Sequence, residues 1–208
     1  MISVLAAAGL ALSTIVIPPA VDPPPTGQIT IDVVTINGSG CRLGTAAVAV
    51  SPDNKAFTVT YSEYLAQVGP QAKPTDFRKN CQLNLKVNVP GGFTYGIAQA
   101  DYRGFADLQK GAKGTTKASY YFQGMSDTDQ RSKTFNGGIS DNWQVTHQTP
   151  VASIIYHPCG ERRNFNVNTE LRVDKGTSDP KKTSFMTMDS TDVSFSTLYH
   201  FAWKKCPK

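Results

Sequence analysis

The side chains that could support metal or acid–base chemistry are few and widely spaced. The histidines are His147, His157 and His200, so a metal-binding or catalytic trio would require the fold to bring all of them together. His200 also alternates with the aromatic residues of the last apolar segment, which predicts that its side chain faces outward. Scattered histidines are more often surface or partly buried residues than ligands. The sequence therefore predicts no metal site.

The acidic and hydroxyl side chains form no complete catalytic motif either. Asp127-Thr128-Asp129 resembles a fragment of a calcium loop, but the remaining positions of an EF-hand are missing. Gly38-Ser39-Gly40 lacks the Gly-x-Ser-x-Gly spacing of a hydrolase nucleophile. We expect no catalytic residue and no cofactor. The sequence favours a non-catalytic role and leaves an enzymatic one open.

A second group of side chains is suited to binding a sugar. Trp143 stands in a polar, glycine-rich region, where an exposed indole could stack on a sugar ring, although a tryptophan there also suits a lid over the edge of the core. Tyr121 is expected to face outward between two inward-facing aromatic residues. Asn142 offers a donor and an acceptor, and Arg162 with Arg163 could hold a carboxylate or phosphate, or pair with nearby acidic residues.

The cysteines are Cys41, Cys81, Cys159 and Cys206, and none stands in a Cys-x-x-Cys pair, which argues against a zinc or redox site. An even number in an exported chain fits two disulfides. Four cysteines allow three connectivities, which the sequence leaves open. We favour Cys41–Cys81 and Cys159–Cys206, because these two sequential loops would each close one half of the domain.

The beginning of the chain has the composition of a secretory signal. Residues 2–17 carry no charge, and as a helix they would reach only about 24 Å, which is short of the roughly 30 Å hydrocarbon core. We predict a signal peptide over residues 1–20, with a buried N-terminal helix as the alternative, then a proline-rich, solvated linker over residues 21–27 and a single domain over residues 28–208. Asn37-Gly38-Ser39 is a sequon, so Asn37 is a candidate for N-glycosylation.

Alternation of apolar and polar residues recurs along the rest of the chain. Leu83, Leu85, Val87 and Val89 interleave with polar residues, and segments 29–33, 57–61, 165–173 and 199–203 repeat the pattern. Turn sequences separate these segments, and Ser62–Val68 is expected to form one or two helical turns at most. The pattern predicts an all-β fold, an antiparallel β-sandwich of jelly-roll or Ig-like type stapled by two disulfides.

The charge balance limits the partners of the protein. A net charge of +5 attracts a secreted protein to anionic cell walls in a salt-dependent way. Dense basic patches with interleaved aromatic residues, which nucleic-acid binding would need, are missing from the sequence. We therefore expect no nucleic acid partner and no membrane insertion after removal of the signal.

Short motifs along the chain resemble a known family. They are Ile36–Cys41, Gly44–Val48, Ser51–Asp53, Arg78–Leu83, Ala100–Gly104, Ser119–Gly124, Pro158–Gly160, Asn168–Val173 and His200–Lys204. Together they are similar to the secreted proteins grouped as domain of unknown function 4360, over about Ile36 to Cys206. The resemblance implies a small, exported, cysteine-paired protein of fungi or actinobacteria, and it implies no reaction and no ligand.

These observations predict a secreted, extracellular protein that binds cell-wall or surface polysaccharide without catalysis. One alternative is a secreted effector or inhibitor that binds another protein, which a large exposed apolar patch would favour. Another is a hydrolase with an unrecognised site, which a cleft gathering a histidine with two carboxylates would favour. The fold alone does not separate these functions, because β-sandwiches host all of them.

Overall fold

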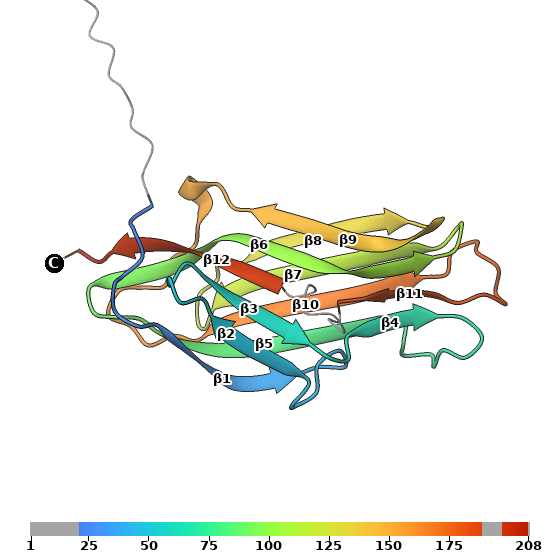
Figure 1. Ribbon diagram of the computed structural model, residues 1–208, viewed down its shortest axis with the longest axis horizontal. Coiled ribbons are helices and arrows are strands. Elements are labelled where there is room, and N and C mark those ends of the chain that lie inside the picture. The colour runs from blue at the N-terminus through green and yellow to red at the C-terminus, as the bar shows by residue number, and fades with distance from the viewer. Residues whose placement is uncertain (1–20, 189–196, 208) are drawn as a thin grey trace, which may run out of the picture.

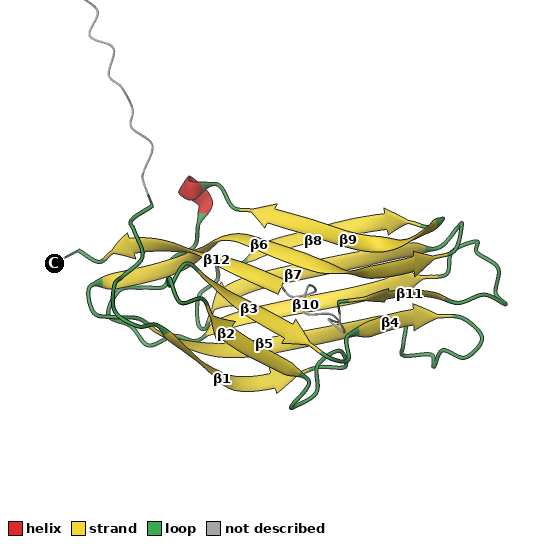
Figure 2. Ribbon diagram, viewed as in Figure 1, coloured by secondary structure: helices red, strands yellow, loops and turns green. Residues whose placement is uncertain are grey.

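Regular structure in the described part of the chain is almost entirely β-strand (Figures 1 and 2). The computed structural model describes residues 21–188 and 197–207. Within these ranges the only helical element is a single 3-10 turn, η1 (Val151–Ser153). The all-β prediction is confirmed. The predicted signal peptide, residues 1–20, lies outside the described residues.

The strands form two antiparallel sheets that pack face to face (Figure 1). The five-stranded sheet has the order β1 (Thr30–Asn37), β5 (Arg78–Asn88), β10 (Phe165–Asp174), β7 (Lys113–Phe122) and β8 (Asp129–Asn136). The second sheet has the order β2 (Ala46–Val50), β3 (Ala56–Tyr61), β12 (Thr197–Lys205), β6 (Phe93–Leu108), β11 (Ser184–Thr187) and β4 (Leu65–Val68), and β9 (Ile139–Gln148) also pairs with β6. The predicted sandwich is thus confirmed.

Side-chain alternation explains most of these strands. In β7 every second residue from Gly114 to Phe122 is buried, and the residues between them are partly exposed. The short apolar stretch at Ser62–Val68 is different, since the helical turns expected there are absent and its second half is strand β4. The four residues of β4 pair with β11, and Ala66 among them is completely buried. Pairing with a neighbouring strand therefore determines the conformation of this segment, which is too short to show a clear hydrophobic periodicity.

The core between the sheets is rich in aromatic side chains. Phe57 of β3 stacks on Tyr199 of β12 with ring centroids 4.7 Å apart, and it meets Phe165 of the facing sheet edge-on at 6.5 Å. Some buried tyrosine hydroxyls find partners in the core: Tyr102 donates to the Tyr120 oxygen at 2.8 Å, and the Tyr64 hydroxyl lies 3.1 Å from the Thr169 hydroxyl. Burying side chains of this size stabilises the fold by about 2–3 kcal/mol each.

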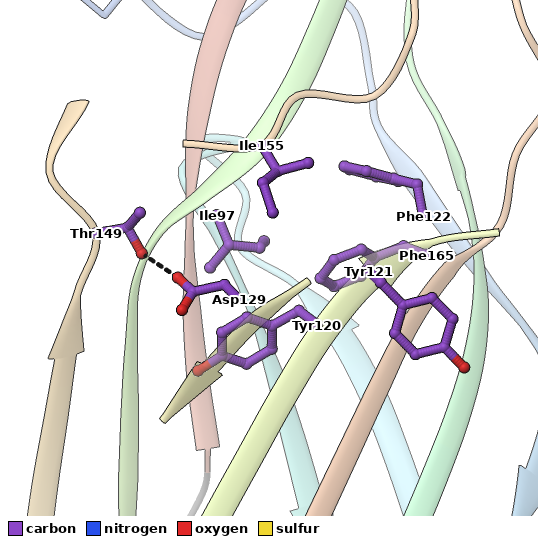
Figure 3. Close-up of a pocket in the computed structure, with 8 residues that line it drawn as sticks. All are labelled: Ile97, Tyr120, Tyr121, Phe122, Asp129, Thr149, Ile155 and Phe165. Atoms are coloured by element: carbon purple, nitrogen blue, oxygen red, sulfur yellow. Dashed lines mark hydrogen bonds between the residues drawn. The ribbon is translucent and has the colours of Figure 1, made fainter. Parts of the chain in front are cut away.

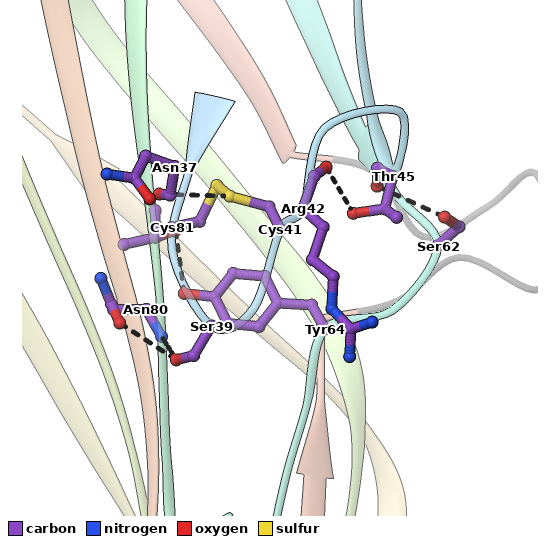
Figure 4. Close-up of a disulfide and its surroundings, with 10 residues drawn as sticks. Asn37, Ser39, Cys41, Arg42, Thr45, Ser62, Tyr64, Asn80 and Cys81 are labelled. Carbon is purple, nitrogen blue, oxygen red and sulfur yellow. Dashed lines mark hydrogen bonds between the residues drawn. A yellow bond between two sulfur atoms is a disulfide. The ribbon is translucent and has the colours of Figure 1, made fainter. Parts of the chain in front are cut away.

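Two disulfides close the ends of the sandwich. Cys41–Cys81 ties the loop after β1 to β5, and Cys159–Cys206 ties the loop before β10 to the end of β12 (Figure 4 shows the first). Their Cα atoms lie 5.3 and 5.8 Å apart, which is normal disulfide spacing. The favoured connectivity is confirmed, and closing loops of this length in the unfolded chain contributes about 4 kcal/mol per bridge.

The proline-rich segment predicted as a linker, residues 21–27, runs along the end of β12. Asp22 pairs with Trp203 through the backbone. The Asn54 amide donates to the carbonyl oxygens of Pro25 at 3.0 Å and Gly27 at 2.9 Å. Pro25 is buried, so this segment is attached to the domain at several points and is solvated only in part.

Candidate functional site

Trp143 lies in the core and presents no ring to a ligand. Its side chain is 5% exposed and packs against Phe135, with ring centroids 5.6 Å apart. Pairing of β9 with β6 places Trp143 opposite Gly104, and a Cβ at Gly104 would lie 2.7 Å from the indole. The expectation of an exposed sugar platform is therefore wrong for Trp143, because the missing side chain of Gly104 makes room for the indole inside the sandwich.

The other predicted contacts lie in three separate places. Asn142 is exposed on the outer face of the seven-stranded sheet. Tyr121 is half-buried on the outer face of the five-stranded sheet, on the far side of the molecule from Asn142. Arg162 and Arg163 belong to the loop that enters β10, next to the end of β7, where the Arg163 Nη1 donates to the Gln123 carbonyl oxygen at 2.7 Å. The fold thus brings Tyr121 and the arginines to one face and leaves Asn142 apart.

Carboxamide side chains dominate the outer face of the five-stranded sheet around Tyr121. We define the amide face as the outward-facing residues of β5, β10 and β7 with the residue that precedes β10: Asn80, Gln82, Asn84, Asn164, Asn166, Asn168, Ser119 and Tyr121. They form rows across the strands, such as Asn84–Asn166–Tyr121 and Gln82–Asn168–Ser119. The sequence contains an indication of the amide face, since asparagine recurs at every second position from 164 to 168.

A chain of hydrogen bonds orders one part of the amide face. Asn164 donates from its Nδ2 to the Asn84 Oδ1 at 2.6 Å, and Asn84 donates to the Asn166 Oδ1 at 2.8 Å. Asn166 is only 4% exposed although it points away from the core. The central strand therefore forms the floor of a trough in which the amide groups have fixed orientations.

Asn168 carries a buried polar atom of the amide face that has no hydrogen-bond partner. Its Oδ1 atom is buried and accepts no hydrogen bond from any described residue. It borders a hollow of about 250 Å³ that Asn80, Gln82, Lys117 and Ser119 also line. A buried carbonyl oxygen without a donor destabilises a protein by about 1–3 kcal/mol, so this position is a candidate to accept a hydrogen bond from a ligand.

One end of the amide face is basic. Arg78 of β5 donates to the Glu170 Oε2 at 2.6 Å, and Lys117 stands beside Glu170 on β7. Arg172 lies over the ring of Phe77, with its guanidinium carbon 5.6 Å from the ring centroid. Glu170 thus stands among three cations at this end, and Asp174 lies beyond Arg172 on the same face of β10, opposite Lys113.

The opposite end opens into a larger hollow of about 560 Å³. Lys86, Arg162, Arg163 and Asn164 line it. Arg163 pairs with Glu161, whereas Arg162 is exposed and has no ion pair within the described ranges. Both predicted arginines therefore border the amide face, and one of them has a free guanidinium group.

The three histidines do not converge. The His147 Nδ1 lies 3.4 Å from the Tyr120 hydroxyl, His157 stacks on Tyr95, and the His200 Nε2 lies 3.0 Å from the Asp101 Oδ2. No group of three metal-ligating side chains occurs among residues 21–188 and 197–207.

Asp101 and His200 form an acid–imidazole pair on the outer face of the seven-stranded sheet. Burial opposes ionisation of Asp101, but hydrogen bonds from Thr146 at 2.6 Å, Gln99 at 2.8 Å and His200 hold its pKa below the usual value. The hydroxyl in this group bonds the carboxylate and not the imidazole, so the described residues contain no Ser-His-Asp arrangement here. A hydrolase site of the expected kind, a histidine with two carboxylates, is not assembled at this pair.

A small apolar cavity lies at the edge of the sandwich (Figure 3). Ile97, Tyr120 and Ile155 surround it, and Tyr121 turns its hydroxyl away from it. The Asp129 carboxylate beside it accepts from Thr149 at 2.8 Å. Its volume of about 20 Å³ suffices for one water molecule and excludes a sugar.

The sequon lies next to the amide face (Figure 4). Asn37 is exposed at the end of β1, directly opposite Gln82. The Ser39 hydroxyl donates to the Asn80 Oδ1 at 3.1 Å and accepts from the Asn80 backbone N–H at 3.2 Å. The Asn37 side chain is thus accessible, and a glycan on it would stand at the β1 rim of the amide face.

Large exposed apolar side chains lie singly or in a pair on separate segments: Val21, Val33, Val34, Leu43, Leu65, Phe77 and Val151. Apart from Val33 and Val34, no two of these described residues are adjacent in the chain. No helix within the described ranges has the length and apolar character that a bilayer crossing requires.

Comparison with known proteins shows the family of this chain. Residues 27–206 match the domain of unknown function DUF4360. The chain is 36% identical over 183 residues to an uncharacterized secreted protein of Arthroderma benhamiae, a match that covers 88% of this chain and 74% of the relative. The protein belongs to the DUF4360 family, and it is secreted, which its two disulfides fit.

Solved structures are only distantly similar. The carbohydrate-binding module TmCBM61, solved with β-1,4-galactotriose, is 10% identical with a TM-score of 0.29, over 84% of this chain and 91% of the module. A Clostridium thermocellum xylanase Xyn10B structure with a CBM22-1 module and xylohexaose is 9% identical with a TM-score of 0.29, over 81% of this chain and 28% of that protein. The Broad Bean Stain Virus structure is 8% identical at the same TM-score, over 69% of this chain and 90% of the viral chain. Likeness at this level carries no argument about a ligand.

Proposed function

We propose that this secreted DUF4360 protein binds polysaccharide of a cell wall or cell surface, without catalysis, through the amide face. A sugar chain presents hydroxyl groups that both donate and accept hydrogen bonds, and a carboxamide is the side chain that offers both in one group. The amide face gathers six such side chains on neighbouring strands.

The hydrogen-bonded series Asn164–Asn84–Asn166 supports this proposal most directly. Because these amides already hold one another, their remaining donors and acceptors are oriented before a ligand arrives. Binding then loses little side-chain entropy, which otherwise costs about 0.5–1.5 kcal/mol for each side chain that is immobilised. A trough floored by fixed amides therefore suits a ligand made of many hydroxyl groups.

Tyr121 and Asn168 supply the two contacts that a sugar would complete. Tyr121 is half-exposed at the end of the Asn84–Asn166 row, so part of its ring is available to pack on the CH groups of a pyranose. The Asn168 Oδ1 lacks a donor that a sugar hydroxyl would provide. These two positions lie on adjacent rows of adjacent strands.

The test is retention of the mature protein on insoluble cellulose, chitin, β-glucan and whole cell wall. Retention is measured at about 0.05 and about 0.5 M salt, since the Debye length falls from roughly 14 to roughly 4 Å between them. We expect retention on at least one matrix at both salts, and a several-fold loss in Tyr121→Ala and Asn168→Ala.

Asn142→Ala is the matched control, because Asn142 is an exposed asparagine on the opposite sheet. Its retention should equal that of the wild type. Failure of the protein to bind any polysaccharide, neutral or acidic, or equal losses in Asn142→Ala and Asn168→Ala, would overturn the proposal.

A further inference from the structure

Cations stand at both ends of the amide face, and most have no acidic partner. At one end Glu170 pairs with Arg78, which leaves Lys117 and Arg172 without an ion pair among the described residues. Positive side chains therefore outnumber negative ones at this end.

The other end repeats the arrangement. Glu161 pairs with Arg163, and Lys86 and Arg162 remain without an ion pair in the described part of the chain. Asp32 stands opposite Lys86 on β1, but its carboxylate accepts a hydrogen bond from Asn88 at 2.9 Å instead. Each end of the face thus retains a net positive charge.

The strand geometry sets the distance between the two basic ends. Glu170 and Lys117 form one row, and Asn164 with the adjoining Arg163 lies six residues earlier on the central strand. At about 3.3 Å per residue the two rows are roughly 20 Å apart. Between them lie only neutral rows, which contain Asn168 and Asn166. A linear ligand along the trough would therefore meet cations at both ends and amides in the middle.

We infer that the polysaccharide bound by the amide face is acidic and carries carboxylate groups, as in a polyuronate. This inference rests on the proposed function and adds the class of sugar. The argument is charge complementarity: an arginine at each end already binds a side-chain carboxylate, Arg78 with Glu170 and Arg163 with Glu161. A uronate carboxylate offers the neighbouring free cations the same planar, two-oxygen partner.

The two-ended arrangement has a consequence for chain length. A ligand shorter than about 20 Å reaches the cations of one end only, whereas a longer one engages both, and the second contact then benefits from a high effective concentration. The affinity for one protein molecule should rise steeply with oligomer length until the ligand spans the face, and should not rise further with longer oligomers.

The experiment compares polygalacturonate with its fully methyl-esterified form, which has the same backbone without the charge. Binding is measured by calorimetry, and a series of oligogalacturonates gives the length dependence. We expect the esterified polymer to bind at least about tenfold more weakly. Lys117→Ala and Arg162→Ala should each weaken binding of polygalacturonate by about two- to fivefold, with the factors multiplying in the double variant because the sites are far apart.

Arg103→Ala and Lys110→Ala are the matched controls, since both cations are exposed outside the amide face. Their affinity should equal that of the wild type. Equal losses of affinity in all four single variants would show that binding depends only on the overall charge of the protein, and would overturn the inference. Retention on a neutral matrix without binding of polygalacturonate would overturn the acidic class alone, whereas failure on every polymer, charged or neutral, would overturn the proposed function as well.

Discussion

Two asparagines on the same face of β10 should respond to alanine substitution with opposite signs. The Asn166 Oδ1 accepts a hydrogen bond from Asn84 at 2.8 Å, whereas the Asn168 Oδ1 is buried without a donor among the described residues. Asn166→Ala removes an acceptor and leaves the Asn84 amide without it, which should lower the free energy of unfolding by about 1–2 kcal/mol. Asn168→Ala removes an unpaired buried oxygen and should raise it by about 1 kcal/mol.

The assay is urea unfolding of the oxidised protein, read by fluorescence, with the slope of the free energy against urea as the check on two-state behaviour. For a domain of this size, 1 kcal/mol corresponds to about 2–4 °C in Tm. Asn142→Ala on the opposite sheet should stay within about 0.5 kcal/mol of the wild type. An equal decrease of the urea midpoint in Asn166→Ala and Asn168→Ala would refute the reasoning, because it would show that both oxygens are paired in the folded state.

The combination of greater stability with weaker polysaccharide retention in Asn168→Ala is the result that separates a binding role from a structural one. A residue that only supports the fold loses stability when it is truncated. When a residue that is kept unpaired for a ligand is truncated, the protein becomes more stable and binds the ligand more weakly. Loss of both properties together would assign Asn168 to the fold.

Three further predictions concern the scaffold. The double variant Cys159→Ser, Cys206→Ser should lower the free energy of unfolding by about 4 kcal/mol in urea titrations, and a loss under about 1 kcal/mol would contradict the loop-closure argument. Burial lowers the pKa of His157, so the imidazole of the unfolded chain takes up a proton at a higher pH than that of the folded protein. The contribution of His157 to the free energy of unfolding should therefore be complete above about pH 6.5 and be lost as the pH falls through the folded pKa. Urea midpoints measured against pH should decrease less steeply in His157→Gln than in the wild type. Gly104→Ala should destabilise the protein by about 2 kcal/mol or more, because the new Cβ would lie 1.9 Å from the Thr187 carbonyl oxygen and 2.7 Å from the indole of Trp143. The near-ultraviolet circular dichroism of Trp143 should change as well, and an unchanged spectrum would contradict this packing.

Much of the scaffold follows from local patterns. Alternation at Leu83–Val89 predicts β5, and the aromatic alternation at Tyr199–Trp203 predicts β12 with His200 outward. Ser62–Val68 shows the limit of such reasoning, because four residues carry no clear period and pairing with β11 decides their conformation. Trp143 shows another limit, since the space that buries its ring is made by Gly104, 39 positions away along the chain by the difference of the two residue numbers.

The candidate site divides in the same way. Tyr121, Arg162 and Arg163 could be named from residue type and phase, and the structure places them beside one face. The amide face itself could not, because polar residues that alternate in a strand are usually no more than a solvated surface. Its distinctive properties are the hydrogen bonds between Asn84 and Asn166 and the orphan oxygen of Asn168.

The sequence by itself determined the all-β class, the secreted state and the family, because each depends on composition, periodicity or motifs that are local in the chain. Tertiary structure alone decided which polar residues share a face, since that depends on strand order and register. β10 lies between β5 and β7, and this non-sequential order places Asn84, Asn166 and Tyr121 in one row although they are widely separated in the chain. A shift of one residue in either pairing would turn alternate side chains to the other face and remove the row.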